Sequence, residues 1–524
     1  MRRSIRAMLL VLLASCDGSG TDVDGGRDAS LRDGGPRIDG AVRSDAAGLD
    51  AAGLDAAGLD AADRDAGAPD GPPDPSTLEG KLMFGYQGWF TAEGDGARVD
   101  RWAHWAGGVP DGSNVTFDAW PDLTDYVAAG VPLYDTNLHL ADGSVARLYS
   151  AYDPEAVDLH FAWMEEHGLD GVFLQMFVGE LTDGSDLREL RDRVAQNVLS
   201  GAEAHDRVFA IEYDLSGADP STLVATIRAH WEWVVNDLRA TASPRYVHHR
   251  GRPVVAVWGP GFTDRAVTPA VANALLDYFE NDAPEPVTVM GGVPSSWRTL
   301  DGDSRPDPAW SAVYARYDVL SPWLVGRFAD EAGATSFVRD RVRPDIALCQ
   351  SRGQDYMPTA FPGFSWTNLM RGMPLNQIPR LAGRFYWTQL RAYTDAGATM
   401  VFSAMFDEVD EGTAMFELAP TTAETPVDGR FLALDADGYS LPSDFYLRLA
   451  GLATRALHRG DAFAADPPIG GGTPMCSPPD TMEVMGRCVP SCGAAGGDSC
   501  DPAVCASRPH LESYDCAVCC DSTP

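Results

Sequence analysis

Four carboxylic acids lie within five residues at the end of an apolar run: Asp407, Glu408, Asp410 and Glu411 follow residues 399–406. Because like charges repel, we expect the pKa of at least one of these acids to be raised. A protonated acid can then protonate a leaving oxygen while an ionised partner acts as base or nucleophile. Such a pair is the minimum equipment for glycoside hydrolysis. A solvated acidic loop and a divalent-cation site are the alternatives.

Aromatic, amide and charged side chains gather where the other apolar runs end. Flat rings suit the C–H faces of sugars, and amides or carboxylates can hydrogen-bond hydroxyl groups. The alternative is that about half of these rings only pack under loops. With Glu408 and Glu411 as the catalytic candidates, the candidate substrate-binding residues are Tyr86, Trp89, His104, Trp105, Gln175, Tyr213, Asp214, Trp258, Trp297, Arg298, Trp323, Trp366 and Asp407.

The elements that must position these residues alternate between strand-like and helix-like segments. The strand-like runs are continuously apolar, as expected of strands buried on both faces. Eight such alternations in about 380 residues predict an α/β fold, a (β/α)8 barrel whose site lies at the carboxyl ends of the strands. An open doubly wound sheet is the competitor. The runs are 82–86, 171–177, 208–213, 253–258, 287–290, 319–323, 357–364 and 399–406, with helices expected at 154–167, 187–204, 221–238 and 269–280.

The overall composition excludes several classes of function. The 524 residues include 40 basic and 76 acidic side chains, a formal net charge of −36, which argues against a nucleic-acid partner. Lys81 is the single lysine, so a phosphate-loop Gly-Lys-Ser/Thr motif is absent, and Lys81 alone could form a Schiff base. We expect a monomer.

The N-terminal residues have the pattern of an export signal. Arginines precede an apolar run that ends Leu13-Ala14-Ser15-Cys16, which resembles a bacterial lipobox. The resemblance implies cleavage before Cys16 and lipidation of its thiol, which would anchor the protein in the cell envelope. An ordinary signal peptide is the alternative. Residues 16–80, rich in Asp, Gly and Ala, are expected to form a disordered acidic tether.

The C-terminal residues carry most of the cysteines. Eight of the ten cysteines fall between Cys476 and Cys520, which in an exported protein predicts a disulfide-bonded module. A zinc site is the alternative. Cys349 stands apart and is expected to be a small buried hydrophobe. The expected domains are a signal (1–15), the tether (16–80), the barrel (81–460), a linker (461–475) and the Cys-rich module (476–524).

Two motifs of the central domain resemble glycoside hydrolase families 71 and 99, which hold α-1,3-glucanases and endo-α-mannosidases. They are Tyr86-Gln87-Gly88-Trp89-Phe90 with Trp102-Ala103-His104-Trp105, and Glu408-Val409-Asp410-Glu411-Gly412-Thr413. The resemblance implies a (β/α)8 enzyme with no metal or organic cofactor. By analogy with family 99, Glu411 would be the general acid/base. Glu408 would deprotonate the sugar's own 2-hydroxyl, so that retention proceeds through an anhydrosugar.

The second motif departs from the family pattern, which usually reads Asn-Glu-Trp-His-Glu-Gly-Thr. Asp407 replaces the Asn, Val409 the Trp and Asp410 the His. These departures indicate that the resemblance supports the reaction class more strongly than it supports the contacts that recognise mannose. The sugar, the linkage and endo or exo action stay open. Two other hypotheses are a lipoprotein that binds sugar without cleaving it, and an adhesin whose Cys-rich tail does the binding.

Overall fold

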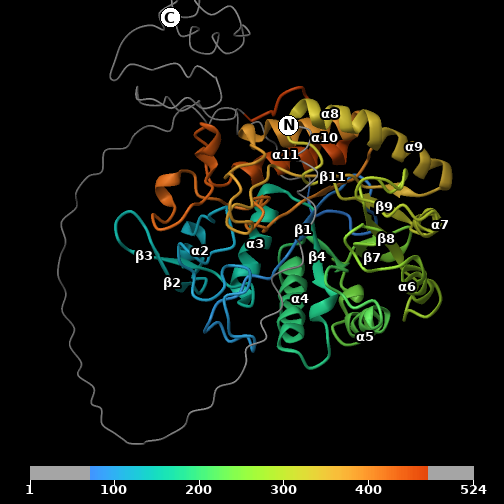
Figure 1. Ribbon diagram of the computed structural model, residues 1–524, viewed down its shortest axis with the longest axis horizontal. Coiled ribbons are helices and arrows are strands. Elements are labelled where there is room, and N and C mark those ends of the chain that lie inside the picture. The colour runs from blue at the N-terminus through green and yellow to red at the C-terminus, as the bar shows by residue number, and fades with distance from the viewer. Residues whose placement is uncertain (1–70, 470–524) are drawn as a thin grey trace, which may run out of the picture. The chain divides into compact units, whose positions relative to one another are not determined.

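Parallel strands close into an eight-stranded barrel in this computed structural model, which describes residues 71–469 (Figure 1). Seven strands are neighbours in the order β9-β8-β7-β5-β4-β1-β12. The eighth position holds two pieces of one extended segment: β10 pairs with β9, and β11 pairs with β12. Only Met357 and Pro358 separate the two pieces, and the Pro358 carbonyl accepts the Phe402 amide at 3.0 Å, so the sheet closes on itself. The strand bounds are β1 (Leu82–Tyr86), β4 (Gly171–Phe177), β5 (Val208–Asp214), β7 (Arg252–Trp258), β8 (Thr288–Val293), β9 (Val319–Pro322), β10 (Asp355–Tyr356), β11 (Thr359–Ala360) and β12 (Val401–Ser403).

Helices surround the strands on the outside of the barrel (Figure 1). Several begin and end with the expected local chemistry: α3 has Pro154 in its first turn and ends at Gly168, whose φ of 69° suits a residue without a Cβ. The bounds are α2 (Thr124–Ala129), α3 (Pro154–His167), α4 (Asp186–Ala204), α5 (Leu223–Asn236), α6 (Pro269–Asn281), α7 (Ala309–Tyr314), α8 (Glu331–Phe337), α9 (Arg343–Arg352), α10 (Arg384–Asp395) and α11 (Phe445–Arg459).

The predicted (β/α)8 barrel is confirmed, and the open doubly wound sheet is excluded by the closure through β10 and β11. The strands β1 and β4 and the helix α3 have the predicted bounds. The agreement has a physical reason, since a strand covered on both faces must be apolar at nearly every position. The last predicted run, 399–406, shrinks to the three residues of β12, because the chain turns out of the sheet after Ser403.

Two long connections pack against each other at the carboxyl end of the barrel. The first, residues 87–153 after β1, contains α2 and the hairpin of β2 (Tyr134–His139) and β3 (Val145–Leu148); the second, residues 404–444, follows β12. The Trp120 amide donates to the Leu432 carbonyl at 3.0 Å, and the amides of Asp118 and Ala119 both donate to Val409 at 3.0 Å. The apolar-run pattern predicted none of these elements, which together hold the segment that carries the acids.

Side chains alternate between the inside of the barrel and the helix layer. Phe173 of β4 and Phe402 of β12 stack inside the barrel with their centroids 5.7 Å apart. On the outside, the Tyr86 hydroxyl meets His160 of α3 at 2.8 Å and the Tyr213 hydroxyl meets His230 of α5 at 2.8 Å. This alternation decides which residues at the strand ends face the barrel axis.

The packed chain begins before the expected start of the barrel at Lys81. Leu78 is fully buried, and its amide donates to His249 Nδ1 at 3.2 Å. The Gly80 amide donates to the Thr399 carbonyl at 2.9 Å. Residues 71–80, assigned above to the tether, therefore belong to the structure around the amino ends of the strands.

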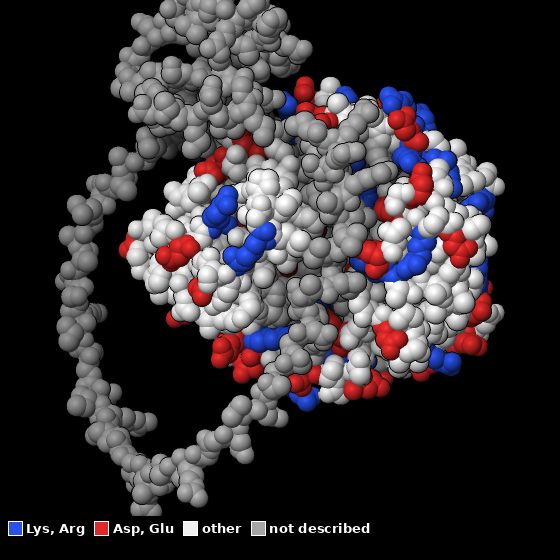
Figure 2. Space-filling view, viewed as in Figure 1, with Lys and Arg blue, Asp and Glu red and all other residues white. Residues whose placement is uncertain are grey.

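Several sequence-based expectations lie outside the described residues. They concern the signal (1–15), Cys16, the tether up to residue 70, the end of the linker and the Cys-rich module (476–524). Cys349 is described: it is fully buried and burial raises the pKa of its thiol to about 12, so it behaves as the small hydrophobe expected. Among residues 71–469 no helix is long and apolar enough to cross a membrane. On the face shown in Figure 2, acidic and basic side chains are interspersed.

Gly451 tests the packing of α11 on α3. A Cβ at Gly451 would lie 2.0 Å from the His167 carbonyl oxygen, so Gly451→Ala must push the two helices apart. We expect it to destabilise the protein by about 1–3 kcal/mol despite alanine's better helix propensity. Urea unfolding followed by tryptophan fluorescence measures the effect. Gly107→Ala is the control, because a Cβ there meets no atom within 4 Å; equal stability of the two variants would contradict the packing argument.

Candidate active site

The acidic segment after β12 forms one tight turn at the carboxyl end of the barrel. The Thr413 amide donates to the Glu408 carbonyl at 3.1 Å, and the Gly412 amide donates to the Val409 carbonyl at 3.2 Å. Gly412 has a φ of 61°, and a Cβ there would lie 3.1 Å from the backbone of Ser365. The turn therefore needs glycine at this position. We call residues 407–413 the acidic turn.

Glu408 is the more deeply held of the two glutamates. Its side chain accepts a hydrogen bond from Gln87 Nε2 at 2.9 Å on one oxygen and from Thr413 Oγ1 at 2.7 Å on the other. Only 6% of the residue is exposed. Burial, followed by the charge of Asp410, raises the pKa of Glu408 to about 8, while the two donors oppose the rise. Glu408 is thus fixed in orientation and can exchange a proton near neutral pH.

Glu411 is the more exposed partner, and its backbone carbonyl accepts the Ser365 amide at 2.8 Å. Burial, then repulsion from Glu408 and from Asp410, raises the pKa of Glu411 well above its usual range. Because ionisation of either glutamate opposes ionisation of the other, the pair favours a state in which one of the two is protonated. The turn thereby presents a proton donor beside a carboxyl group that can ionise.

Asp407 ties the acidic turn to the end of β1. One carboxylate oxygen accepts the Gln87 amide at 2.7 Å, and the other accepts the Gly88 amide at 2.8 Å. The side chain is 1% exposed, and burial raises its pKa to about 7 against the opposing effect of the two amides. Both of its oxygens accept backbone amides, so in the described structure Asp407 fixes the acidic turn against the end of β1.

Asp410 contacts an aromatic stack on the loop after β1. His104 Nδ1 lies 3.3 Å from an Asp410 oxygen. The His104 ring stacks on Trp89 with centroids 3.7 Å apart, and Trp89 stacks on Phe177 at 5.1 Å. Burial raises the pKa of Asp410 and lowers that of His104, so the surroundings disfavour the charged form of both groups.

Two buried charged residues support the acidic turn from behind. Asp118 is fully buried and accepts hydrogen bonds from Ser365 Oγ at 2.5 Å and from the amides of Thr367 and Asn368 at 2.6 and 2.7 Å. Arg380 Nη2 donates to the carbonyls at positions 412 and 414, at 2.9 and 2.7 Å. The position of the two glutamates therefore depends on Asp118 and on residues 365–380, which lie far apart in the sequence.

Polar and aromatic side chains continue around the barrel from the acidic turn. Gln175 of β4 lies opposite Glu212 of β5, and Asp214 lies opposite Trp258 of β7. Glu212 is 1% exposed; burial, followed by the charge of Asp214, raises its pKa to about 8. The Trp258 and Trp323 rings meet edge to face with centroids 5.6 Å apart. Amide, acid and ring are thus combined on neighbouring strands, as in a site for a polyhydroxylated ligand.

The structure brings some of the sequence-predicted residues together and separates others. Those around the acidic turn or on the inner side of the adjoining strand ends are Asp407, Glu408, Glu411, Trp89, His104, Gln175, Asp214, Trp258 and Trp323.

Three of the other candidates do not face the barrel axis. Tyr86 and Tyr213 point outward to histidines of the helix layer, because each is one residue out of phase with the inward positions. Trp105 is fully buried in the first long connection, where its Nε1 donates to the Tyr149 carbonyl at 3.1 Å. These side chains pack the protein and do not line the mouth of the barrel, which corrects their proposed role in substrate binding.

The three remaining candidates are occupied by local contacts. Arg298 forms an ion pair with Asp345 at 2.5 Å. Trp297 is 1% exposed and lies edge to face against Tyr314, and Trp366 packs on Phe364. Gln87 and Glu212 also stand at strand ends but were not among the predicted site residues. Counting in steps of two separates Glu212 and Asp214 from Tyr213, but β5 is buried at every position, so the count does not show which set faces inward.

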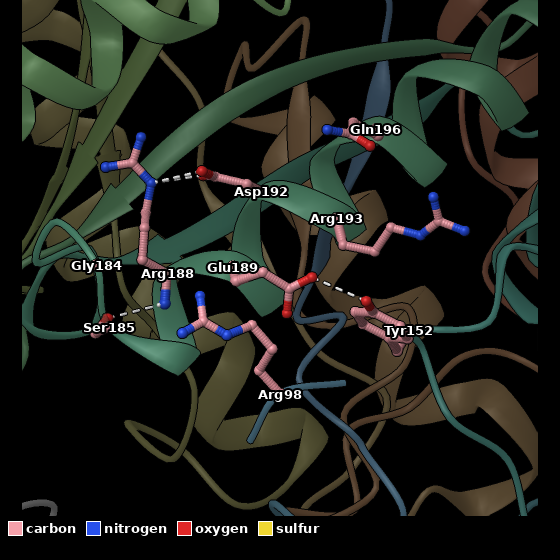
Figure 3. A pocket seen from close by; sticks show the side chains of 9 residues that line it. All are labelled: Arg98, Tyr152, Gly184, Ser185, Arg188, Glu189, Asp192, Arg193 and Gln196. Carbon is pink, nitrogen blue, oxygen red and sulfur yellow. Dashed lines mark hydrogen bonds and ion pairs between the residues drawn. The ribbon is translucent and has the colours of Figure 1, made fainter. Parts of the chain in front are cut away.

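A surface pocket of about 370 Å³ lies on α4 and is not lined by any residue of the acidic turn (Figure 3). Its charged groups are largely paired with one another: Arg188 Nε lies 2.7 Å from Asp192, and the Tyr152 hydroxyl donates to Glu189 at 2.8 Å. Within residues 71–469 no group of three or more His, Cys, Asp or Glu side chains is arranged to hold a metal ion. The acidic turn is therefore the stronger candidate for chemistry.

Known structures share the fold of this chain. No family model matches the sequence, and no curated protein matches it. The barrel is similar to the family 99 endo-α-mannosidase from Bacteroides thetaiotaomicron, with a TM-score of 0.51 and 14% identity over 73% of this chain and 99% of that one. A structure of such an endo-α-mannosidase in complex with bis-tris propane gives a TM-score of 0.50 at 15% identity, over the same shares of the two chains. The chain thus has the fold of the family 99 glycoside hydrolases, which agrees with the resemblance noted from its motifs.

Proposed function

We propose that this protein is a glycoside hydrolase that cleaves an α-linked polysaccharide or glycan, with Glu408 and Glu411 as the reacting pair. The observation that carries the proposal is the acidic turn: two glutamates three residues apart, at the carboxyl end of a (β/α)8 barrel, each with its pKa raised by burial and by a neighbouring acid. The fold shared with an endo-α-mannosidase supports the proposal.

The two glutamates differ in the way that an acid and a base should. Glu411, partly exposed and with its pKa raised well above the usual range, would give its proton to the departing glycosidic oxygen. Glu408, held by Gln87 and Thr413, would accept the proton of the sugar 2-hydroxyl as that oxygen bonds to the anomeric carbon. Water would then attack the anomeric carbon of the anhydrosugar and give up a proton to Glu411, while Glu408 returns its proton to the 2-oxygen. Both steps follow the family 99 analogy.

The substrate need not be a mannan. In the acidic turn Val409 and Asp410 stand where the family pattern has a tryptophan and a histidine, and Asp410 contacts His104 of the first long connection. The contacts nearest the reacting pair thus differ from the pattern of the family. An α-glucan or another α-linked glycan is therefore tested alongside α-mannan.

Hydrolysis of a panel of α-mannans and α-1,3-glucans by the purified full chain tests the proposal. We expect Glu408→Gln and Glu411→Gln each to lower kcat by about 100- to 10,000-fold, since each removes one proton transfer. Glu417→Gln is the matched control: Glu417 is also buried with a pKa raised to about 8, but its neighbours are Asp125, Asp122 and Asp444. Activity that survives both turn substitutions would overturn the assignment. Binding without product release would favour the non-catalytic lipoprotein.

Thr413 gives a pH-dependent test of Glu408. Its hydroxyl donates to Glu408 and lowers the pKa of that carboxyl. In Thr413→Val the donor is lost, the pKa of Glu408 rises further, and the rising limb of the kcat/KM profile should move to higher pH by about 0.5–1 unit. Thr413→Ser keeps the hydroxyl and should retain the wild-type limb. A limb that stays in place in Thr413→Val would show that Glu408 is not the base.

We further propose that the protein is held in a bacterial cell envelope by a lipid on Cys16, on the support of the lipobox-like residues 13–16. The intact mass of the protein isolated from membranes should show cleavage before Cys16 and an added diacylglycerol. Cys16→Ser should abolish the added mass and the membrane association. If the chain is found unmodified and free of the membrane both with and without the substitution, residues 1–15 act as an ordinary signal peptide.

A further inference from the structure

Three inward side chains form a row that leads away from the acidic turn. The β1–β4 register, in which Tyr86 lies opposite Leu174, brings the next residues, Gln87 and Gln175, side by side. Gln175 is in turn opposite Glu212 of β5. Because Gln87 Nε2 donates to Glu408 at 2.9 Å, the row begins at the proposed base and runs across two neighbouring strands.

Two atoms of this row are buried without a hydrogen-bond partner among the described residues. They are Gln87 Oε1 and Glu212 Oε2. Gln87 is 4% exposed and Glu212 is 1% exposed. An unpaired buried polar atom is destabilising, so two of them in one row point to a ligand that completes the hydrogen bonds.

The chemistry of the two atoms is complementary. Gln87 uses its amide nitrogen on Glu408, so its free oxygen can only accept a hydrogen bond. The groups around Glu212 are Gln175 on β4, Asp214 on its own strand, and the Glu180 and Arg265 side chains that act on Asp214. Burial and Asp214 raise the pKa of Glu212 to about 8, so at neutral pH its free oxygen can donate. One acceptor and one donor fit two hydroxyl groups of one sugar ring.

We propose that Glu212, in its acid form, donates a hydrogen bond to a hydroxyl of the sugar bound at the acidic turn, and that Gln87 accepts one from a second hydroxyl. Gln175 lies between these two residues in the row and hydrogen-bonds the Glu212 side chain. This inference rests on the proposed function and names Glu212 as a specificity-determining residue, distinct from the reacting pair. A sugar unit that lacks the matching hydroxyl should be bound less tightly, because the buried acid is left unpaired.

Binding to a Glu411→Gln variant tests the inference without turnover. The probes are the α-manno- and α-gluco-oligosaccharides of the activity panel, and calorimetry gives Kd between pH 6.5 and 9.5. If binding requires the proton of Glu212, Kd should weaken about 30-fold over this range, as tenfold per pH unit above a pKa near 8 requires. Adding Glu212→Gln supplies a permanent donor, so the affinity at pH 6.5 should be kept within about threefold and the pH dependence should fall to the part contributed by Glu408, which titrates in the same range.

Two further variants complete the test. Glu212→Ala, in the same background, should weaken binding by about 10- to 100-fold at pH 6.5. Glu417→Gln, which removes a buried acid of similar pKa elsewhere, should leave the pH dependence intact. Unfolding midpoints show whether each variant is folded. If Glu212→Ala does not fold, the isosteric Glu212→Gln variant alone tests the inference.

The outcomes separate this inference from the function on which it rests. If Glu212→Gln leaves the pH dependence unchanged, or Glu212→Ala binds as tightly as its parent, Glu212 does not touch the sugar and water satisfies its free oxygen. In that case wild-type hydrolysis would still stand. A wild-type chain that neither binds nor cleaves any member of the panel would overturn both proposals.

Discussion

The structure depends on the cost of burying several carboxyl groups on one turn. An ionised carboxylate loses its hydration when it is buried, and neighbouring carboxylates add repulsion to that loss. In the acidic turn the cost is offset in two ways. Asp407 and Glu408 each accept two hydrogen bonds, and burial raises the pKa values of Glu408, Asp410 and Glu411, which favours their uncharged forms. A shared proton is also what acid–base chemistry needs.

This constraint explains why the chain departs from a minimal barrel at two places. Thr413 and Gly412 supply hydrogen bonds within the acidic turn, but the other donors and acceptors that hold the turn lie outside it. They come from the end of β1, from Asp118 in the first long connection, and from Arg380 ahead of α10. The two long connections at the carboxyl end therefore form the wall that keeps water from the acids and holds both glutamates in place.

The fold and the chemistry carry different information in this protein. The fold is shared with an endo-α-mannosidase at 14% identity, so the scaffold is kept while most side chains differ. What points to a reaction is local: the glutamates of the acidic turn and the donors that touch them. The imidazole near the turn is that of His104, in the first long connection, 3.3 Å from Asp410.

The sequence by itself determined the barrel and the acidic turn. Strands such as β1 and β4 are apolar throughout because both faces are covered, and the four acids are neighbours in the chain, so neither inference needs long-range information. Only the tertiary structure decided which strand-end residues face inward, since a continuously apolar run carries no alternation to set its phase. Tyr213 therefore points to α5 while Glu212 faces the axis. It also decided that Gln87 holds Glu408, because that contact joins residues 321 positions apart and depends on the closure of the barrel.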